Sequence, residues 1–124
     1  MINQAAIALR RHAPLMTLVI ALAIGYLSLS PLEDLPKAPG GDKLHHFIAY
    51  ACLTFPMMFA DAPRWPRILI PAIIYGGAIE LIQPYVNRYG EWLDFAANGA
   101  GCLIGAGLAL LALRLLGRGN LPRL

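Results

Sequence analysis

The chain has 124 residues, of which 58% are hydrophobic and 14% are charged, and its net charge is +3. A soluble domain is nearer half apolar and a quarter charged, so this surplus of apolar residues indicates a protein whose solvent is mostly lipid. The basic residues lie near the ends of apolar segments and form no stripe with interleaved aromatic residues, which argues against a nucleic-acid partner. The apolar segments use most of the length, so we expect a single domain over residues 1–124.

The first apolar segment covers residues 13–30 and is followed by Pro31. Its length is that of one bilayer crossing. A signal peptide is the alternative, because basic residues precede the apolar segment. The segment is long for a signal peptide, however, and Ser28-Leu29-Ser30 is a poor cleavage site. We therefore expect an uncleaved transmembrane helix.

Three more apolar helices are expected, over residues 44–60, 68–84 and 93–116. A loop rich in proline and glycine precedes the first of them, and short polar links separate the others. Together with the first segment, they predict an all-α protein, a bundle of four transmembrane helices. Gly101 and Gly105 form a GxxxG motif in the last helix, which allows close helix packing. We expect this motif to pack within the chain rather than to make a dimer.

The basic residues predict the orientation of such a bundle. With four crossings, both termini lie on one side of the membrane. That side holds seven basic residues: Arg10, Arg11, Arg64, Arg67, Arg114, Arg118 and Arg123. The other side holds three: Lys37, Lys43 and Arg88. Because cytoplasmic loops carry the excess of lysine and arginine, both termini are predicted to be cytoplasmic.

Polar side chains recur near the outward end of three predicted helices. At a rise of about 1.5 Å per residue, His46, Glu80 and Asn98 each lie about one turn inside a helix end. Within each helix, the polar residues are spaced three or four apart, which places them on one face. We expect these faces to converge beneath a lid formed by Lys43, Arg88 and Glu91. The candidate ligand-binding residues are Asp42, Lys43, His46, Tyr50, Glu80, Gln83, Arg88, Asp94 and Asn98.

Four short motifs carry a resemblance to a known family. They are Asp42-Lys43-Leu44-His45-His46-Phe47-Ile48-Ala49-Tyr50, Glu80-Leu81-Ile82-Gln83, Arg88 and Asp94-Phe95-Ala96-Ala97-Asn98-Gly99. In this order, over roughly residues 42 to 105, the chain resembles the VanZ-like family of small bacterial membrane proteins, named for a teicoplanin-resistance protein. The resemblance implies a multi-pass protein of the bacterial cytoplasmic (inner) membrane, with a function in the cell envelope and a link to glycopeptide (teicoplanin) resistance. It supplies no established catalytic residue.

Two readings of the cluster remain open. His46, Glu80 and Asp94 are the candidates for acid–base catalysis, because histidine and carboxylates are the usual general acids and bases. The alternative is a hydrogen-bond network that ties the helices together, in which the buried Tyr50 hydroxyl takes part. Whether the protein is an enzyme is left undecided by the sequence.

Lys43 and Arg88 also have two readings. They could hold a phosphate or carboxylate head group, or they could pair with neighbouring acidic residues. No cofactor is expected. A metal held by Asp42, His46, Glu80 and Asp94 is a weaker alternative, because one histidine among carboxylates is a sparse ligand set, and we expect no metal site. Cys52 and Cys102 are expected to be core thiols.

Three functions follow from these observations. The first is binding of an anionic membrane-embedded envelope molecule, such as a lipid-linked cell-wall precursor or a phospholipid, by the outward-facing site. The second is a small proton-coupled transporter that acts as a dimer, since a membrane glutamate in a four-helix bundle suits exchange. The third is a non-catalytic accessory subunit of a larger envelope enzyme, with the cluster as a structural tie.

Overall fold

The computed structural model of the chain describes residues 4–30, 41–86 and 90–117, without the side chain of Asp42. The long elements are the α-helices α1 (Gln4–Leu29), α2 (Asp42–Asp61), α3 (Trp65–Ile82) and α4 (Trp92–Leu116). Two short 3-10 helices, η2 (Ala62–Arg64) and η3 (Gln83–Val86), follow α2 and α3. The described residues contain no strand, so the predicted all-α class is confirmed.

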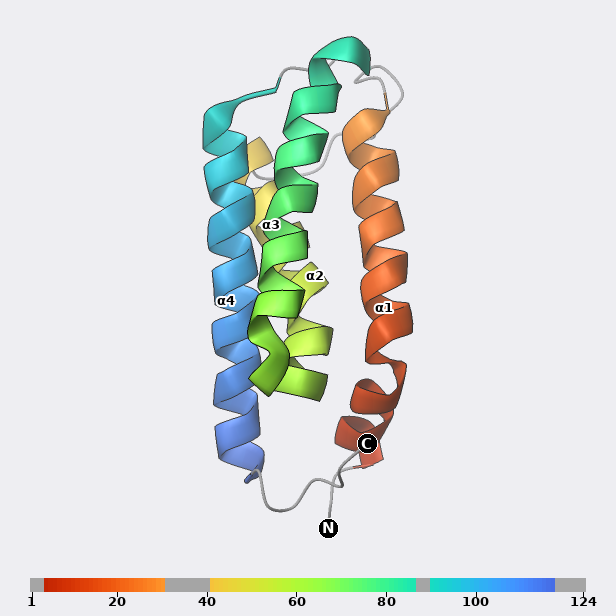
Figure 1. The fold of residues 1–124 in the computed structure, drawn as a ribbon, viewed down its shortest axis with the longest axis vertical. Helices are drawn as coiled ribbons and strands as arrows, with labels where there is room; N and C mark the ends of the chain where they lie inside the picture. Colours follow the sequence, from red (N-terminus) through yellow and green to blue (C-terminus); the bar gives the residue numbers. More distant parts are fainter. Residues whose placement is uncertain (1–3, 31–40, 87–89, 118–124) are drawn as a thin grey trace.

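The helices lie side by side along one axis, as Figure 1 shows. One end of the bundle, the upper end in Figure 1, holds the last turn of α1, the first turn of α2, the last turn of α3 and the first turn of α4. We call it the site end. At the opposite end α1 begins, α4 ends and η2 joins α2 to α3.

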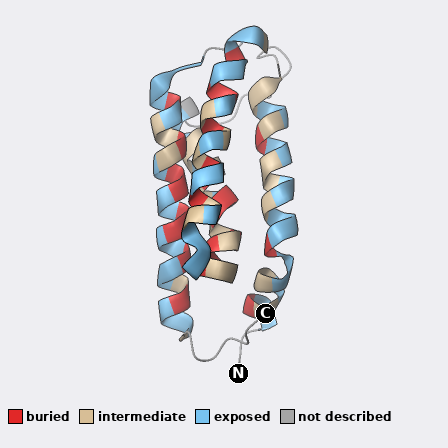
Figure 2. Cartoon of the chain, viewed as in Figure 1, coloured by how far each residue is buried: buried red, intermediate tan, exposed pale blue. Residues whose placement is uncertain are grey.

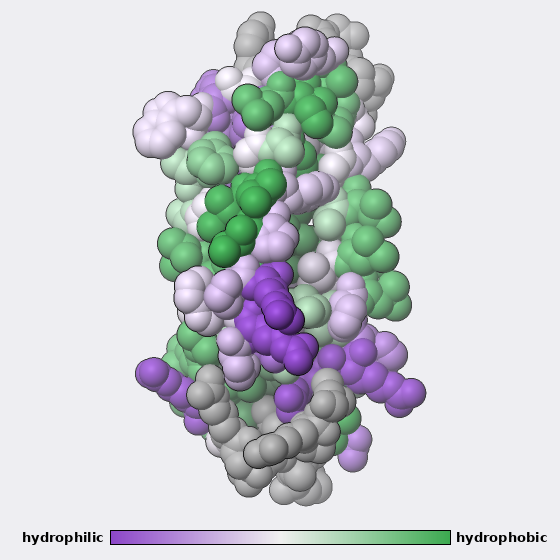
Figure 3. Space-filling view, viewed as in Figure 1, coloured by the Kyte–Doolittle hydropathy of each residue, from purple (hydrophilic) through white to green (hydrophobic). Residues whose placement is uncertain are grey.

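Three stretches of the described chain are long and apolar enough to cross a membrane: Gln4–Leu29, Lys43–Val86 and Trp92–Leu116. The middle stretch has 44 residues and contains both α2 and α3. Much of the surface in Figure 3 is correspondingly apolar, and hydrophilic side chains gather toward the end opposite the site end. The composition of the helices is therefore that of a membrane protein.

The predicted helix ends agree with the observed ones to within a few residues, except at the start of α1. We expected this helix to begin near residue 13, whereas it begins at Gln4. Packing explains the extra turns, because Ala6 is buried in the core and the Arg10 guanidinium donates to the Ala60 carbonyl oxygen at 3.2 Å. At the start of α3, Pro66 fits into the first turn, where a backbone N–H has no helical partner.

The contact between α2 and α4 is the most extensive in the bundle. Gly101 and Gly105 make it possible: a Cβ at Gly101 would collide with the Phe47 carbonyl oxygen, and one at Gly105 with the Ala51 carbonyl oxygen. Between them, the Thr54 hydroxyl donates to the Cys102 carbonyl oxygen at 2.9 Å. The prediction that the GxxxG motif packs within the chain is therefore confirmed.

Helix α1 lies against α2 and is the most exposed element, with only Ala6, Ala13 and Ile24 fully buried. In Figure 2 most of its surface is exposed or half-buried. Its link to α3 is made largely by polar side chains of α3 and η3 that bond to the α1 backbone. Among them, the Tyr75 hydroxyl donates to the Ala21 carbonyl oxygen.

The α2–α4 contact predicts opposite effects for two glycines of α4. Gly105→Ala should lower the free energy of unfolding by about 1–3 kcal/mol, because the added methyl group forces two backbones apart. Gly107→Ala is the matched control, since a Cβ there meets nothing within 4 Å. It should leave stability unchanged or raise it by up to about 1 kcal/mol through helix propensity. Thermal unfolding in detergent measures both, and equal effects would contradict the packing described.

Candidate functional site

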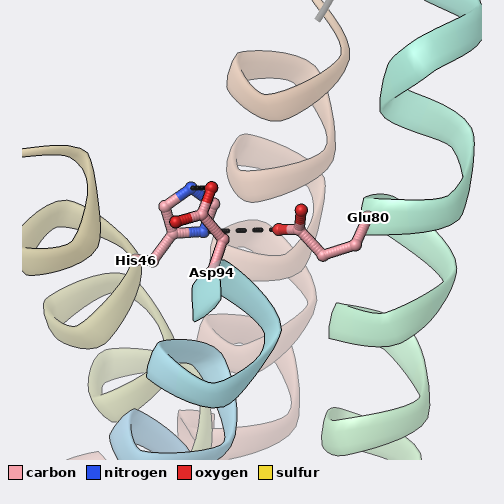
Figure 4. A group of neighbouring side chains, drawn as sticks. All are labelled: His46, Glu80 and Asp94. Carbon is pink, nitrogen blue, oxygen red and sulfur yellow. Dashed lines mark ion pairs between the residues drawn. The ribbon is translucent and has the colours of Figure 1, made fainter. Parts of the chain in front are cut away.

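The polar residues of three helices meet at the site end, inside an otherwise apolar bundle. His46 lies on the second turn of α2, Glu80 on the last turn of α3, and Asp94 and Asn98 on the first two turns of α4. Figure 4 shows that Glu80 and Asp94 both point toward the His46 ring. The convergence expected from helical spacing is therefore observed for these residues.

Asn98 connects the cluster and is fully buried. Its amide oxygen lies 2.8 Å from His46 Nδ1, and its amide nitrogen donates to Glu80 Oε1 at 3.4 Å. Since the amide nitrogen donates to the Glu80 carboxylate, it is the amide oxygen that faces His46. An amide oxygen can only accept a hydrogen bond, so the proton between the two residues is carried by His46 Nδ1. Asn98 thus fixes the ring of His46 and the carboxylate of Glu80 at once.

Glu80 is also held by the backbone of the segment that precedes α4. Its Oε2 accepts a hydrogen bond from the Glu91 backbone N–H at 3.2 Å. The chain reaches this position because Gly90 has no side chain: a Cβ there would collide with the Glu80 carbonyl oxygen. Sequence reasoning missed Gly90. The signal that could have found it is a glycine two residues before a helix whose first turn carries the site.

His46 lies between two carboxylates. Its Nδ1 is 3.8 Å from Glu80 Oε1, and its Nε2 is 3.9 Å from Asp94 Oδ2, as the dashed lines in Figure 4 mark. One potential ligand atom from each of His46, Glu80 and Asp94 lies within 4.8 Å of the other two. These three side chains are therefore the described group best placed to share a cation.

Lys43 covers the cluster on the side away from the bundle. Its ammonium group pairs with Glu91 Oε2 at 3.1 Å and with Asp94 Oδ1 at 3.4 Å, and half of its side chain is exposed. Two members of the predicted lid, Lys43 and Glu91, are thus in contact. Arg88, the third, lies outside the described residues.

Of the remaining predicted residues, the two whose side chains the structure describes, Tyr50 and Gln83, are not joined to this network. The side chain of Asp42 is not described. Tyr50 is buried beside Gly76 of α3, but its hydroxyl has no hydrogen-bond partner in the described part of the chain, contrary to expectation. Gln83 turns toward α1, where its amide donates to the Ser28 carbonyl oxygen at 3.0 Å. That carbonyl lies in the last turn of α1, where no helical N–H is available, so Gln83 caps α1.

The comparisons with known proteins agree with the motifs. The sequence profile described as VanZ/LLP1 matches residues 6–113, which is most of the chain. The protein therefore belongs to the VanZ/LLP1 family, and the resemblance carried by the four motifs is confirmed. No curated protein and no solved structure matches the chain.

The role of Asn98 can be tested by a double-mutant cycle. Asn98→Ala should lower the free energy of unfolding by about 1–3 kcal/mol, because it leaves buried atoms of His46 and Glu80 without a partner. Combined with His46→Ala, it should show a coupling of at least about 0.5 kcal/mol.

Gln83→Ala provides the control for this cycle, because Gln83 bonds to α1 and not to Asn98. Its effect should simply add to that of Asn98→Ala in denaturation measurements. If His46 and Asn98 were also additive, the two residues would not act as one network.

Proposed function

We propose that this protein crosses the bacterial inner membrane four times, with both termini in the cytoplasm, and binds an anionic lipid-linked envelope molecule at the site end. The site end then faces outward, at the depth of the lipid head groups. The observation that carries the proposal is the half-exposed ammonium group of Lys43, held at the end of three helices above a buried polar network.

The lengths of α2 and α3 support four crossings. With 20 and 18 residues, each spans roughly 30 Å, which is about the thickness of the hydrocarbon core. Exposed aromatic residues lie at both ends of the bundle: Tyr85 of η3 and Trp92 of α4 at the site end, and Trp65 of α3 at the opposite end. Tyrosine and tryptophan favour the two membrane interfaces, so they suit the boundaries of such a crossing.

The charges support the orientation. Five of the described arginines lie toward the opposite end: Arg10, Arg11, Arg64, Arg67 and Arg114. At the site end, Lys43 is the one lysine or arginine among the described residues. The positive-inside tendency then favours a cytoplasmic opposite end and an outward-facing site.

The head group would meet Lys43 and Arg88, because a guanidinium group binds phosphate or carboxylate through two parallel hydrogen bonds. Glu91 is the natural point of exchange, since its carboxylate is exposed and pairs with Lys43. A ligand phosphate could replace it there. His46, Glu80, Asp94 and Asn98 would shape the floor of the site.

The family suggests which anion this is. A membrane protein of the VanZ/LLP1 family with a site at head-group depth suits a lipid-linked cell-wall precursor or a phospholipid. Sequestering or presenting such a molecule would connect the site to glycopeptide (teicoplanin) resistance, because those drugs act on cell-wall precursors at the outer surface.

Orientation can be tested with cysteines labelled by a membrane-impermeant maleimide. Lys37→Cys should react in cells whose outer envelope has been removed, and Arg64→Cys should react only after the membrane is permeabilised. The wild type gives the background: Cys102 is a buried thiol as expected, whereas Cys52, which we expected in the core, is exposed. Labelling of Arg64→Cys before permeabilisation would refute the orientation.

Ligand binding can be tested by native mass spectrometry of the protein purified in mild detergent. The wild type should carry a lipid-sized adduct, and Lys43→Ala and Arg88→Ala should each reduce its occupancy by about tenfold, because each removes a charged hydrogen bond. Arg64→Ala is the matched control, since Arg64 pairs with Asp61 at the opposite end.

The adduct's mass would identify the ligand class. An adduct that persisted at wild-type occupancy in both site variants would refute the proposed site. If no adduct appeared on the folded wild type, an accessory subunit of an envelope enzyme would become the better reading.

A further inference from the structure

The charges of the described cluster are out of balance. It contains three carboxyl groups, on Glu80, Glu91 and Asp94, and one ammonium group, on Lys43, which pairs with Glu91 and Asp94. Glu80 and Asp94 are both more than nine-tenths buried. Burying charged groups away from water is costly unless opposite charge compensates them. The excess of carboxyl groups in the cluster therefore favours the binding of a cation over the binding of an anion alone.

The hydrogen bonds around His46 indicate where that cation fits. Since the Nδ1 proton lies between His46 and Asn98, Nε2 is the ring nitrogen whose lone pair is available to a ligand when the ring is neutral. Nε2 lies 3.9 Å from Asp94 Oδ2, which is also an acceptor. Asp94 Oδ1 pairs with Lys43 and makes no hydrogen bond within the described residues. Two acceptors, one on half-buried His46 and one on buried Asp94, thus lie close together at a position that suits a positive charge.

The separation of the three ligand atoms suits a metal ion. An ion placed among three atoms that lie within 4.8 Å of one another is within about 2.8 Å of each, against about 2.1 Å in an occupied site. To close that difference, the Glu80 and Asp94 carboxylates would move toward His46 and exchange part of their present bonds to Asn98, Glu91 and Lys43 for bonds to the ion. In addition, a metal-bound histidine usually donates its other N–H to an oxygen that fixes the ring, and Asn98 Oδ1 already accepts in this way.

We propose that His46, Glu80 and Asp94 bind a first-row divalent metal ion such as Zn²⁺, and that this ion supplies the positive charge by which the site holds an anionic head group. The imidazole nitrogen selects such an ion over Mg²⁺ and Ca²⁺, which prefer ligand sets made only of oxygen. Three protein ligands leave coordination positions open for a phosphate oxygen. The metal site stands independently, whereas its role toward the head group rests on the function proposed above.

The metal site is tested by calorimetric titration of Zn²⁺ into lipid-free protein carrying a tag without histidine. The wild type should bind one ion per chain, and its unfolding temperature should rise with Zn²⁺ and fall again with EDTA. His46→Gln and Asp94→Asn should each weaken binding at least about tenfold. His45→Gln is the matched control, because it removes the neighbouring histidine of α2, which is not in the ligand group.

Two outcomes would overturn the metal site. One is a folded wild type that neither binds Zn²⁺ nor gains stability from it. The other is binding that His45→Gln weakens as much as His46→Gln does, which would indicate surface histidines.

The role of the ion is tested separately, by comparing the lipid adduct in native mass spectra of Zn²⁺-loaded and EDTA-treated protein. Occupancy should fall at least tenfold on metal removal. An unchanged adduct would refute the role while leaving the metal site intact. Zn²⁺ binding without any adduct would instead contradict the function proposed for the site.

Discussion

The bundle depends on the pairing of Asn98 with His46 and Glu80. An amide buried among apolar helices cannot form hydrogen bonds with water, so each of its hydrogen-bonding atoms needs a protein partner. Asn98 finds them on α2 and α3, which fixes both helices against α4 at the same depth. The glycines of α4 extend this constraint toward the opposite end, because they bring α2 within backbone contact along the same face. Polar pairing thus sets the register, and close packing maintains it.

Much of this arrangement could be predicted from sequence, because helical spacing alone assigns residues to faces. The faces of His46, Glu80 and Asn98 were predicted to converge, and they do. Spacing is a weaker guide near a helix end. Gln83 follows Glu80 by three residues, yet it opens η3, where the chain has left the α-helical path, and its side chain turns to α1.

Other features could not be read from the sequence because they depend on contacts between distant segments. The extension of α1 to Gln4 depends on the packing of Ala6 and on the bond from Arg10 to α2. The importance of Gly90 appears only once the chain is seen to pass over the Glu80 carbonyl oxygen. Residue types that are ordinary in a list, such as glycine and alanine, become specific through what lies next to them.

The way in which α1 is attached has a consequence for how the sequence can vary. Tyr75 and Gln83 bond to carbonyl oxygens of α1, and every residue type offers such a carbonyl. Substitutions at Ala21 and Ser28 therefore preserve the acceptors as long as the helix remains, whereas Tyr75 and Gln83 have few replacements. The sequences of family members should therefore vary in the first helix and keep the two side chains that donate to it, Tyr75 and Gln83.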